Sequence, residues 1–171
     1  AAAAASAVDA VKRVAIAERG NWKARAAEAG FRFHTIDGAP YWDESAYYAF
    51  TLRQLENDIE DPSAELHAMA MDLVGEVVGS EALMAQLAIP AAFRDWIAES
   101  WRRRDPHLYG RLDFAYDGNG PAKLYELNYD TPTSLYEASF FQWQWLEDQR
   151  NRGVLPQQAD QFNSIHETLV E

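Results

Sequence analysis

Four polar side chains in the segment 111–128 have residue types and a spacing suited to binding a metal ion and a phosphate group. They alternate with apolar residues along two strand-like runs, RLDFA and KLYELN, which the turn sequence DGNGP separates. If Asn119 lies near the middle of this turn, an antiparallel register places all four on one face of a hairpin. The four residues are Arg111, Asp113, Glu126 and Asn128.

The register predicts that the carboxylates of Asp113 and Glu126 lie directly opposite each other, which destabilises a hairpin unless a cation offsets the repulsion. One interpretation is Mg²⁺, with Mn²⁺ as an alternative, bound by Asp113, Glu126 and Asn128 while Arg111 contacts a phosphate. The other is a salt bridge from Arg111 to one carboxylate, without metal. A glycosidase-like carboxylate pair is disfavoured, because a raised carboxyl pKa needs an apolar setting rather than an adjacent cation.

A polar loop follows the second strand-like run and leads into a predicted helix. Its backbone N–H groups and hydroxyls can receive a carboxylate or phosphoryl group of a substrate. Capping of the helix by a Ser134–Glu137 box accounts for part of the same pattern, so both interpretations stay open. The candidate substrate-binding residues are Asp130, Thr131, Thr133 and Ser134.

Helical periodicity and capping signals predict the elements that hold the hairpin. The predicted features are a helix from Asn21 that ends at Gly30, a turn at Asp37-Gly38, a helix start at Asp61-Pro62, N-terminal boundaries at Ser80 and Pro90, a helix from Leu135 to about Gln149, and a last helical run at 159–171. Together they indicate an α+β fold, with helices packed on a small, mostly antiparallel sheet.

Composition excludes several classes of function. The net charge of −12 argues against a nucleic-acid partner, and the absence of cysteine excludes disulfides and zinc–thiolate sites. No apolar run approaches the roughly 20 residues of a membrane span, and no secretory signal is visible. We therefore expect a cytoplasmic protein that acts without a membrane, while the oligomeric state is left open. Residues 1–12, which begin with five alanines, are interpreted as a tag or an unassigned segment.

The run PHLYGRLDFAYDGNGPAKLYELNYDTPTSLYEASFFQWQWLE resembles the glutathionylspermidine synthase-like family, as do FHTIDGAPYWDESAYYAFT before it and LPQQADQFNSIHE after it. The resemblance covers nearly all of residues 13–171. It implies an ATP-grasp ligase, dependent on Mg²⁺, that uses ATP to join a carboxylate to an amine through an acyl phosphate with release of ADP. The implied substrates are a small peptide or other carboxylate and a polyamine or other amine.

The resemblance also implies roles for the hairpin residues. Asp113, Glu126 and Asn128 match the magnesium ligands that hold the phosphates of ATP, and Arg111 matches an arginine that contacts the transferred phosphoryl group or the acyl phosphate. One departure is that Thr131, Thr133 and Ser134 stand where the namesake has serine and cysteine contacts to glutathione. A second is the lack of a cysteine-dependent amidase, so the sequence is more similar to a stand-alone synthase-like branch.

An ATP-grasp enzyme needs lysines and a flexible lid around the nucleotide. Residues 13–171 contain only Lys23 and Lys123 and no glycine-rich loop, and the last predicted helix stops without a capping signal. We therefore interpret residues 13–171 as the N-terminal, pre-ATP-grasp and metal-hairpin part of a ligase whose remainder is missing, and expect it to be inactive alone. The alternative is a non-catalytic binding or assembly module derived from the same family.

Overall fold

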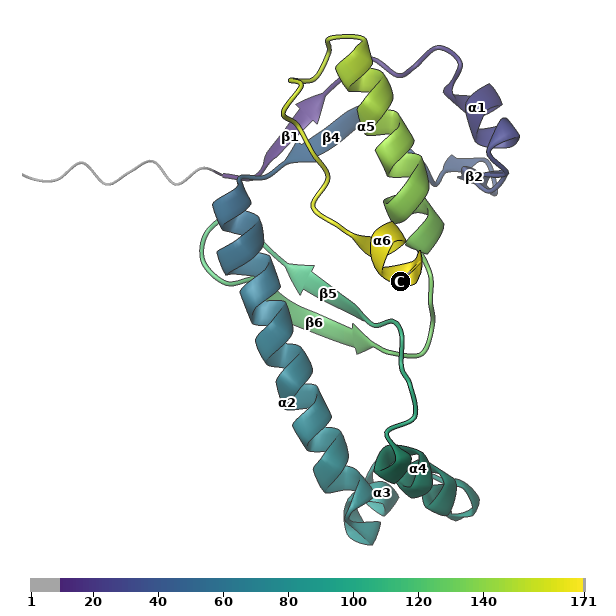
Figure 1. Ribbon diagram of the computed structural model, residues 1–171, viewed down its shortest axis with the longest axis vertical. Helices are drawn as coiled ribbons and strands as arrows, with labels where there is room; N and C mark the ends of the chain where they lie inside the picture. The colour runs from purple at the N-terminus through teal and green to yellow at the C-terminus, as the bar shows by residue number, and fades with distance from the viewer. Residues whose placement is uncertain (1–9, 171) are drawn as a thin grey trace, which may run out of the picture. The chain divides into compact units, whose positions relative to one another are not determined.

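A computed structural model describes residues 10–170, and these divide into two compact units (Figure 1). One unit is Leu52–Asp130, and the other joins residues 10–51 with 131–170. The described strands form three separate two-stranded antiparallel sheets, and with the helices they confirm the predicted α+β class. Within these residues no helix is long and apolar enough to cross a bilayer. Residues 1–9 of the predicted segment 1–12 lie outside the described part, whereas Lys12 pairs with Ala49.

The unit Leu52–Asp130 consists of a helical half followed by a hairpin. Its elements are the π-helix η1 (Gln54–Glu60), α2 (Asp61–Val78), α3 (Glu81–Gln86), α4 (Ala91–Arg103), β5 (Arg111–Ala115) and β6 (Lys123–Asn128). The predicted helix start at Asp61-Pro62 is confirmed, because α2 begins at Asp61. No side chain caps this start, since Glu60 already has helical dihedral angles and η1 continues directly into α2. Pro62 is tolerated there because it lies in the first turn of α2.

Pro62 changes the hydrogen bonding of the helix that precedes it. Proline has no peptide N–H, so it cannot donate to the carbonyl four residues earlier, which is that of Asp58. This carbonyl instead accepts a 2.7 Å hydrogen bond from the peptide N–H of Ala122, just before β6. A local feature of the helix thereby provides an attachment point for the hairpin.

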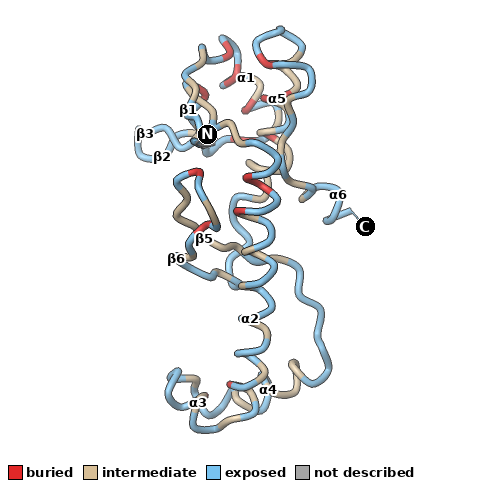
Figure 2. Tube along the Cα trace, turned by 90° about the vertical axis from the view of Figure 1, so that its left-hand side faces the viewer, coloured by how far each residue is buried: buried red, intermediate tan, exposed pale blue. Residues whose placement is uncertain are grey.

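The later helix boundaries of this unit agree with the sequence. The Ser80 hydroxyl accepts a 3.3 Å hydrogen bond from the N–H of Leu83, and Pro90 precedes α4 with extended backbone. Few side chains of these helices are buried, however. Of the described residues only Val77 in α2 is buried and none in α4, and Trp96 keeps 76% of its surface exposed (Figure 2).

The other unit combines four short strands with helices from both ends of the described chain. Its elements are β1 (Lys12–Ala15), α1 (Trp22–Glu28), β2 (Thr35–Ile36), β3 (Ala39–Pro40), β4 (Ala46–Ala49), the π-helix η2 (Glu137–Phe141), α5 (Gln142–Asn151) and α6 (Ile165–Val170). β1 pairs with β4, and β2 pairs with β3 around the predicted turn. Asp37 and Gly38 both have positive φ there, 49° and 81°, as a type I′ turn requires.

Two capping predictions in this unit are wrong. The side chain of Asn21 forms no cap hydrogen bond to α1, although its carbonyl accepts the N–H of Arg25 at 3.1 Å. Ser134 and Glu137 do not form a capping box, because Ser134 has a φ of 66° and Glu137 accepts a 2.7 Å hydrogen bond from the hydroxyl of Tyr41. The tertiary contact from Tyr41 replaces the local one. Gly30, with a φ of 80°, ends α1 as predicted.

An aromatic core holds this unit together. Trp22, Ala26, Phe31 and Phe141 form one buried cluster, and a second consists of Trp145, Leu146 and Leu155. The Trp42 ring packs against both clusters, so α1, η2 and α5 share one apolar interior. Beside it lie Arg19 and Glu44, whose side chains are 2% and 0% exposed and form a salt bridge of 2.5 Å.

Candidate functional site

The open end of the β5–β6 hairpin has the predicted register. Arg111 lies opposite Asn128, and Asp113 lies opposite Glu126. Side chains alternate between the two faces of a strand, and opposed residues share a face. These four residues therefore occupy one face of the hairpin, while the Leu112–Leu127 pair occupies the other.

Nearer the turn the predicted register is wrong. Phe114 pairs with Leu124 instead of Tyr125, and Ala115 pairs with Lys123 instead of Leu124. Tyr125 is an extra residue in β6, a β-bulge, and 79% of its surface is exposed. The segment between the strands is also bound to η1, since the N–H of Ala122 donates to the carbonyl of Asp58 at 2.7 Å, so its conformation is not set by the turn sequence alone.

Arg111 and Asp113 form a salt bridge along the strand. Nε of Arg111 donates to Oδ1 of Asp113 at 2.7 Å, and Nη2 donates to Oδ2 at 3.4 Å. This hydrogen bond and the Asp113 charge raise the pKa of Arg111, and the charge of Glu126 acts in the same direction. The side chains of Arg111 and Asp113 are 33% and 41% exposed, so the pair lies at a surface that a ligand can reach.

Asn128 is the last residue of β6 and the last member of the polar face. Its Oδ1 accepts a 3.2 Å hydrogen bond from the N–H of Asp130, which turns the chain sharply as it leaves the strand. Glu126 is exposed and forms no hydrogen bond or ion pair within residues 10–170, apart from its long-range interaction with Arg111. Asp130 is likewise exposed.

The other predicted substrate-binding residues belong to the unit that contains residues 131–170. The N–H of Thr133 donates to the carbonyl of Thr131 at 2.9 Å, and the carbonyl of Ser134 accepts the N–H of Ala138 at 3.2 Å. The hydrogen bond from Tyr41 to Glu137 raises the pKa of Tyr41 beside this loop. The loop is thus shaped by its own backbone hydrogen bonds and by the Tyr41–Glu137 pair.

Sequence reasoning missed a clamp at the open end of the hairpin. A Cβ added to Gly110 would lie 2.4 Å from the ring of Tyr129, so the ring packs directly on the glycine backbone. The Tyr129 hydroxyl lies 2.9 Å from Nδ1 of His67 in α2, and the rings of His67 and His107 are 6.2 Å apart. Gly110 precedes Arg111 and Tyr129 follows Asn128, so this clamp fixes the residues next to the polar face. A glycine and an aromatic residue directly flanking the polar set were the available signal.

A second attachment holds the turn end of the hairpin, and the sequence did not reveal it either. The Tyr116 hydroxyl donates a 2.6 Å hydrogen bond to Oδ2 of buried Asp58, and Nε2 of Gln54 donates to the carbonyl of Gly118 at 3.2 Å. The hydrogen bond from Tyr116 lowers the pKa of Asp58, although desolvation opposes it. Burial first, and then this hydrogen bond, raise the pKa of Tyr116 to about 12.

The same unit contains a large groove of about 1280 Å³. Residues of α2, α4 and the segment before β5 line it, together with Leu112 from the apolar face of the hairpin and Tyr129 of the clamp. The polar face and the groove are therefore supported by the same hairpin, whose two faces have opposite chemical character.

The donor set of the polar face fits a magnesium ion that is only partly bound by protein. Within the described residues, no three His, Cys, Asp or Glu side chains lie close enough to hold a metal by themselves. The face offers two carboxylates and one amide, whereas Mg²⁺ takes six oxygen ligands and commonly completes them with water and phosphate. Arg111 compensates the charge of Asp113 but forms no ion pair with Glu126 in the described part, which leaves the offset of the opposed carboxylates incomplete.

Comparison with known proteins identifies the family of the chain. The family model for the glutathionylspermidine synthase preATP-grasp domain matches residues 13–171. A Haemophilus influenzae protein named as a candidate acid–amine ligase is 41% identical over 145 residues, which cover 83% of this chain and 35% of that protein. The bifunctional glutathionylspermidine synthetase/amidase of Escherichia coli is 30% identical over 107 residues, 61% of this chain and 17% of that protein. The trypanothione synthetase of Crithidia fasciculata is 27% identical over 84 residues, 48% of this chain and 13% of that protein.

The named relatives are a candidate acid–amine ligase and two synthetases, which places them in the class of ligases. Within that class, the chain belongs to the glutathionylspermidine synthase preATP-grasp family, as its sequence resemblance predicted. It spans about a third of the length of the Haemophilus influenzae relative.

Proposed function

We propose that this chain is the pre-ATP-grasp and metal-hairpin part of an ATP-dependent acid–amine ligase that forms an amide bond through an acyl phosphate. The observation that carries the proposal is the pairing of Arg111 with Asn128 and of Asp113 with Glu126 on one hairpin face. A longer polypeptide supplies the nucleotide-binding lysines and lid in this proposal. The membership of the family and the names of the relatives support it.

In this proposal Asp113, Glu126 and Asn128 hold Mg²⁺, or Mn²⁺ in its place, against the phosphates of ATP. The ion neutralises phosphate charge and orients the γ-phosphoryl group when it is bound. Arg111 contributes N–H groups to a phosphoryl or acyl phosphate oxygen, while its bond to Asp113 keeps the guanidinium oriented. The clamp of Gly110 and Tyr129 keeps these side chains in register.

The loop after β6 is the proposed site for the acid substrate. Asp130, Thr131, Thr133 and Ser134 provide backbone N–H groups and hydroxyls that suit a carboxylate. The family resemblance implies that the acid is a small peptide or other carboxylate and that the second substrate is a polyamine or other amine. The threonines and the serine give this loop a different shape and chemistry from a cysteine-containing one, so glutathione is not assumed as the acid. ATP and Mg²⁺ are both available in the cytoplasm, which is the proposed location.

A manganese titration tests the proposal at the level of binding. The protein, with and without ATP, is titrated with Mn²⁺ and free ion is followed by electron paramagnetic resonance. The double variant Glu126→Gln, Asn128→Ala is expected to weaken Mn²⁺ binding at least tenfold, because it removes one charged and one neutral ligand. The matched control is Glu65→Gln, an exposed carboxylate in α2 of the same unit. Equal affinity in the double variant and the wild type would sink the metal assignment.

Activity of the complete ligase separates catalysis from an assembly role. Asp113→Asn retains size and removes charge, so ADP release with matching acid–amine pairs is expected to fall steeply. A complete ligase that keeps full ADP release with Asn at position 113 would instead favour the non-catalytic module.

A further inference from the structure

A second polar site lies in the unit that joins residues 10–51 with 131–170, and it consists of residues not assigned above. A cavity of about 520 Å³ opens beside α1 and the C-terminal end of α5. Its lining consists of Arg19, Gly20, Asn21, Arg25, Asp148 and Arg152. Three of these six residues are arginines, in a protein whose net charge is −12.

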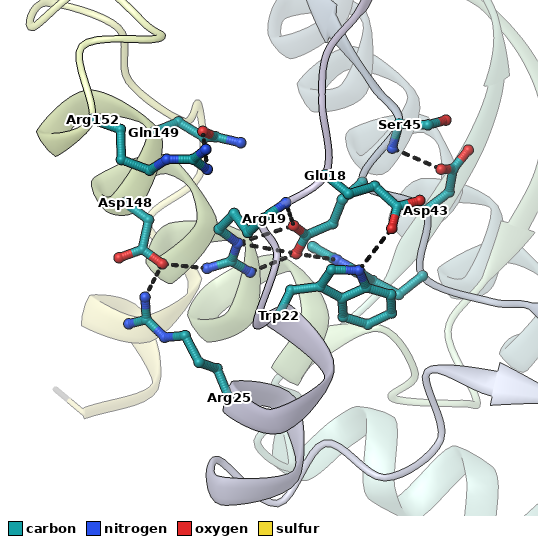
Figure 3. Close-up of polar contacts among 11 residues, drawn as sticks. Glu18, Arg19, Trp22, Arg25, Asp43, Ser45, Asp148, Gln149 and Arg152 are labelled. Atoms are coloured by element: carbon teal, nitrogen blue, oxygen red, sulfur yellow. Dashed lines mark hydrogen bonds and ion pairs between the residues drawn. The ribbon is translucent and has the colours of Figure 1, made fainter.

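Two of these arginines, Arg19 and Arg25, share the carboxylate of Asp148 in the cavity wall. Nη1 of Arg19 donates to Oδ2 of Asp148 at 2.5 Å, and Nη1 of Arg25 donates to the same oxygen (Figure 3). Desolvation raises the pKa of Asp148, but the hydrogen bonds from Arg25 and Arg19 outweigh it and lower that pKa overall. Asp148 is therefore ionised at neutral pH and supplies the only negative charge among the six lining residues.

The remaining charge balance of the cavity is positive. The buried carboxylate of Glu44 compensates the charge of Arg19. The two positive charges of Arg25 and Arg152 then face only the one negative charge of Asp148 among the lining residues. Arg152 follows α5, where a cation also stabilises the helix C-terminus, and one of its N–H groups donates to Oε1 of Gln149 at 3.2 Å. The positive surplus is thus not cancelled within the described residues that line the cavity.

Hydrogen-bond donors outnumber acceptors along the same wall. A guanidinium has five N–H groups, whereas Arg25 and Arg152 each use one on a neighbour in the described chain. The side chain of Asn21 makes no cap hydrogen bond to α1, so its amide adds donors at the cavity edge. Guanidinium groups match carboxylate and phosphate oxygens in two-point geometry.

We propose that the cavity formed by Arg19, Asn21, Arg25, Asp148 and Arg152 binds a small oxyanion, a carboxylate or a phosphate group. Arg25 and Arg152 contact the anion, and Arg19, locked between Glu44 and Asp148, adds fixed positive charge behind it. Asp148 competes with the anion for the N–H groups of Arg25 and so limits the affinity of the site for the anion. The site does not depend on the ligase assignment, since all its residues lie outside the hairpin.

Isothermal titration of the protein with inorganic phosphate, and separately with succinate, tests this site. The titrations are run at about 0.01 M ionic strength, where screening is weak. Arg152→Gln and Arg25→Gln are each expected to weaken binding about tenfold, because each removes a charged donor. Asp148→Asn is expected to tighten binding several-fold by releasing Arg25. Tighter binding of phosphate than of succinate identifies a phosphate ligand, and the reverse order identifies a carboxylate.

The control is Arg102→Gln, an exposed arginine in α4 that pairs with Glu99. It carries the same loss of charge and is expected to leave both affinities unchanged. Arg152 is exposed, so its replacement does not disturb the core, and thermal unfolding of each variant checks this point. The proposal is overturned if neither anion gives a saturable heat, if Arg152→Gln binds like the wild type, or if Asp148→Asn binds more weakly.

Discussion

The peptide N–H of Ala122 lies 2.7 Å from the carbonyl oxygen of Asp58 and donates a hydrogen bond to it. Pro62 has no peptide N–H, so it cannot donate to that carbonyl the hydrogen bond that any other residue of a regular α-helix would donate. The carboxylate of Asp58 accepts the Tyr116 hydroxyl, so a single residue of η1 holds both sides of the hairpin loop. The proline that follows η1 is therefore part of how the site hairpin is positioned.

Tyr116→Phe tests this attachment through the pH dependence of stability. The pKa of Tyr116 is raised to about 12, so between about pH 10 and 12 the unfolded chain loses this proton before the folded one does. Stability present below pH 10 is consequently lost as the pH rises towards 12. In urea unfolding, the variant is expected to be less stable at neutral pH and to lack this alkaline decrease.

The acid side gives an independent check of the same contact. Tyr116 lowers the pKa of Asp58, so the stability from Asp58 is present above its ordinary value of 3.8 and is lost as the pH falls through the lower folded value. Without the Tyr116 hydroxyl the pKa of Asp58 is lowered less, so the free energy of unfolding of the variant should decrease less than that of the wild type as the pH falls below 3.8. If the free energy of unfolding depends on pH in the same way for wild type and Tyr116→Phe at both ends of the pH range, the attachment is contradicted.

Gly110→Ala tests the clamp at the open end. The new methyl group meets the Tyr129 ring at 2.4 Å, which forces the ring or the strand to move. Overpacking of this kind costs about 1–3 kcal/mol. Thermal unfolding should show that loss, and Mn²⁺ affinity should fall with it because Asn128 adjoins Tyr129.

Gly20→Ala is the matched control for that experiment. No atom lies within 4 Å of a Cβ at Gly20, and this glycine belongs to the other unit. Its Mn²⁺ affinity should equal that of the wild type. If Gly110→Ala retains wild-type stability and Mn²⁺ affinity, Tyr129 does not set the position of Asn128.

Glu44→Gln tests the buried ion pair. The Glu44 and Arg19 side chains are 0% and 2% exposed, so neutralising Glu44 leaves a buried guanidinium with only Asp148 for compensation. Breaking a buried pair from one side costs about 3–5 kcal/mol. Urea unfolding of Glu44→Gln, Arg19→Met and the double variant forms a thermodynamic cycle. The double variant is expected to lose less stability than the two single losses combined, whereas strict additivity would mean that the pair is not coupled.

Arg111→Lys tests orientation apart from charge. Lysine retains the positive charge but not the two-point contact that Arg111 makes with Asp113. We expect the complete ligase to lose about 100-fold or more in kcat, as for removal of an oriented transition-state donor. The melting temperature should change little, because this salt bridge is at the surface. Full activity in the lysine variant would mean that charge alone suffices at this position.

The parts of the fold that follow from local sequence were predictable. Strand alternation placed Arg111 opposite Asn128, Ser80 capped its helix, and Gly30 supplied the left-handed residue after α1. The family, and with it the candidate roles, followed from a dense resemblance that the match over residues 13–171 confirms. The roles of the individual site residues stay predictions.

The parts that failed depend on contacts distant in sequence. The Tyr41 hydroxyl donates a hydrogen bond to the carboxylate of Glu137, which the capping box would have used, although the two residues are 96 positions apart in sequence. Ala122 is attached to Asp58 across 64 positions of sequence, and no periodicity in either segment encodes this contact or the register shift near the turn. For the clamp the sequence offered a signal, because Gly110 and Tyr129 directly flank the polar set, but the contact of the Tyr129 hydroxyl with His67 of α2 depends on residues 62 positions apart.

The bulge at Tyr125 separates the strand register at the turn end of the hairpin from the register at its open end. A strand that already contains one unpaired residue can lose it, after which Phe114–Leu124 and Asp113–Glu126 become consecutive pairs of a regular ladder. Insertions and deletions on the turn side of Glu126 are thus absorbed without rotating Arg111 and Asp113 to the opposite face. The polar face of the hairpin is therefore set by the open end alone, independently of the length of the segment between the strands.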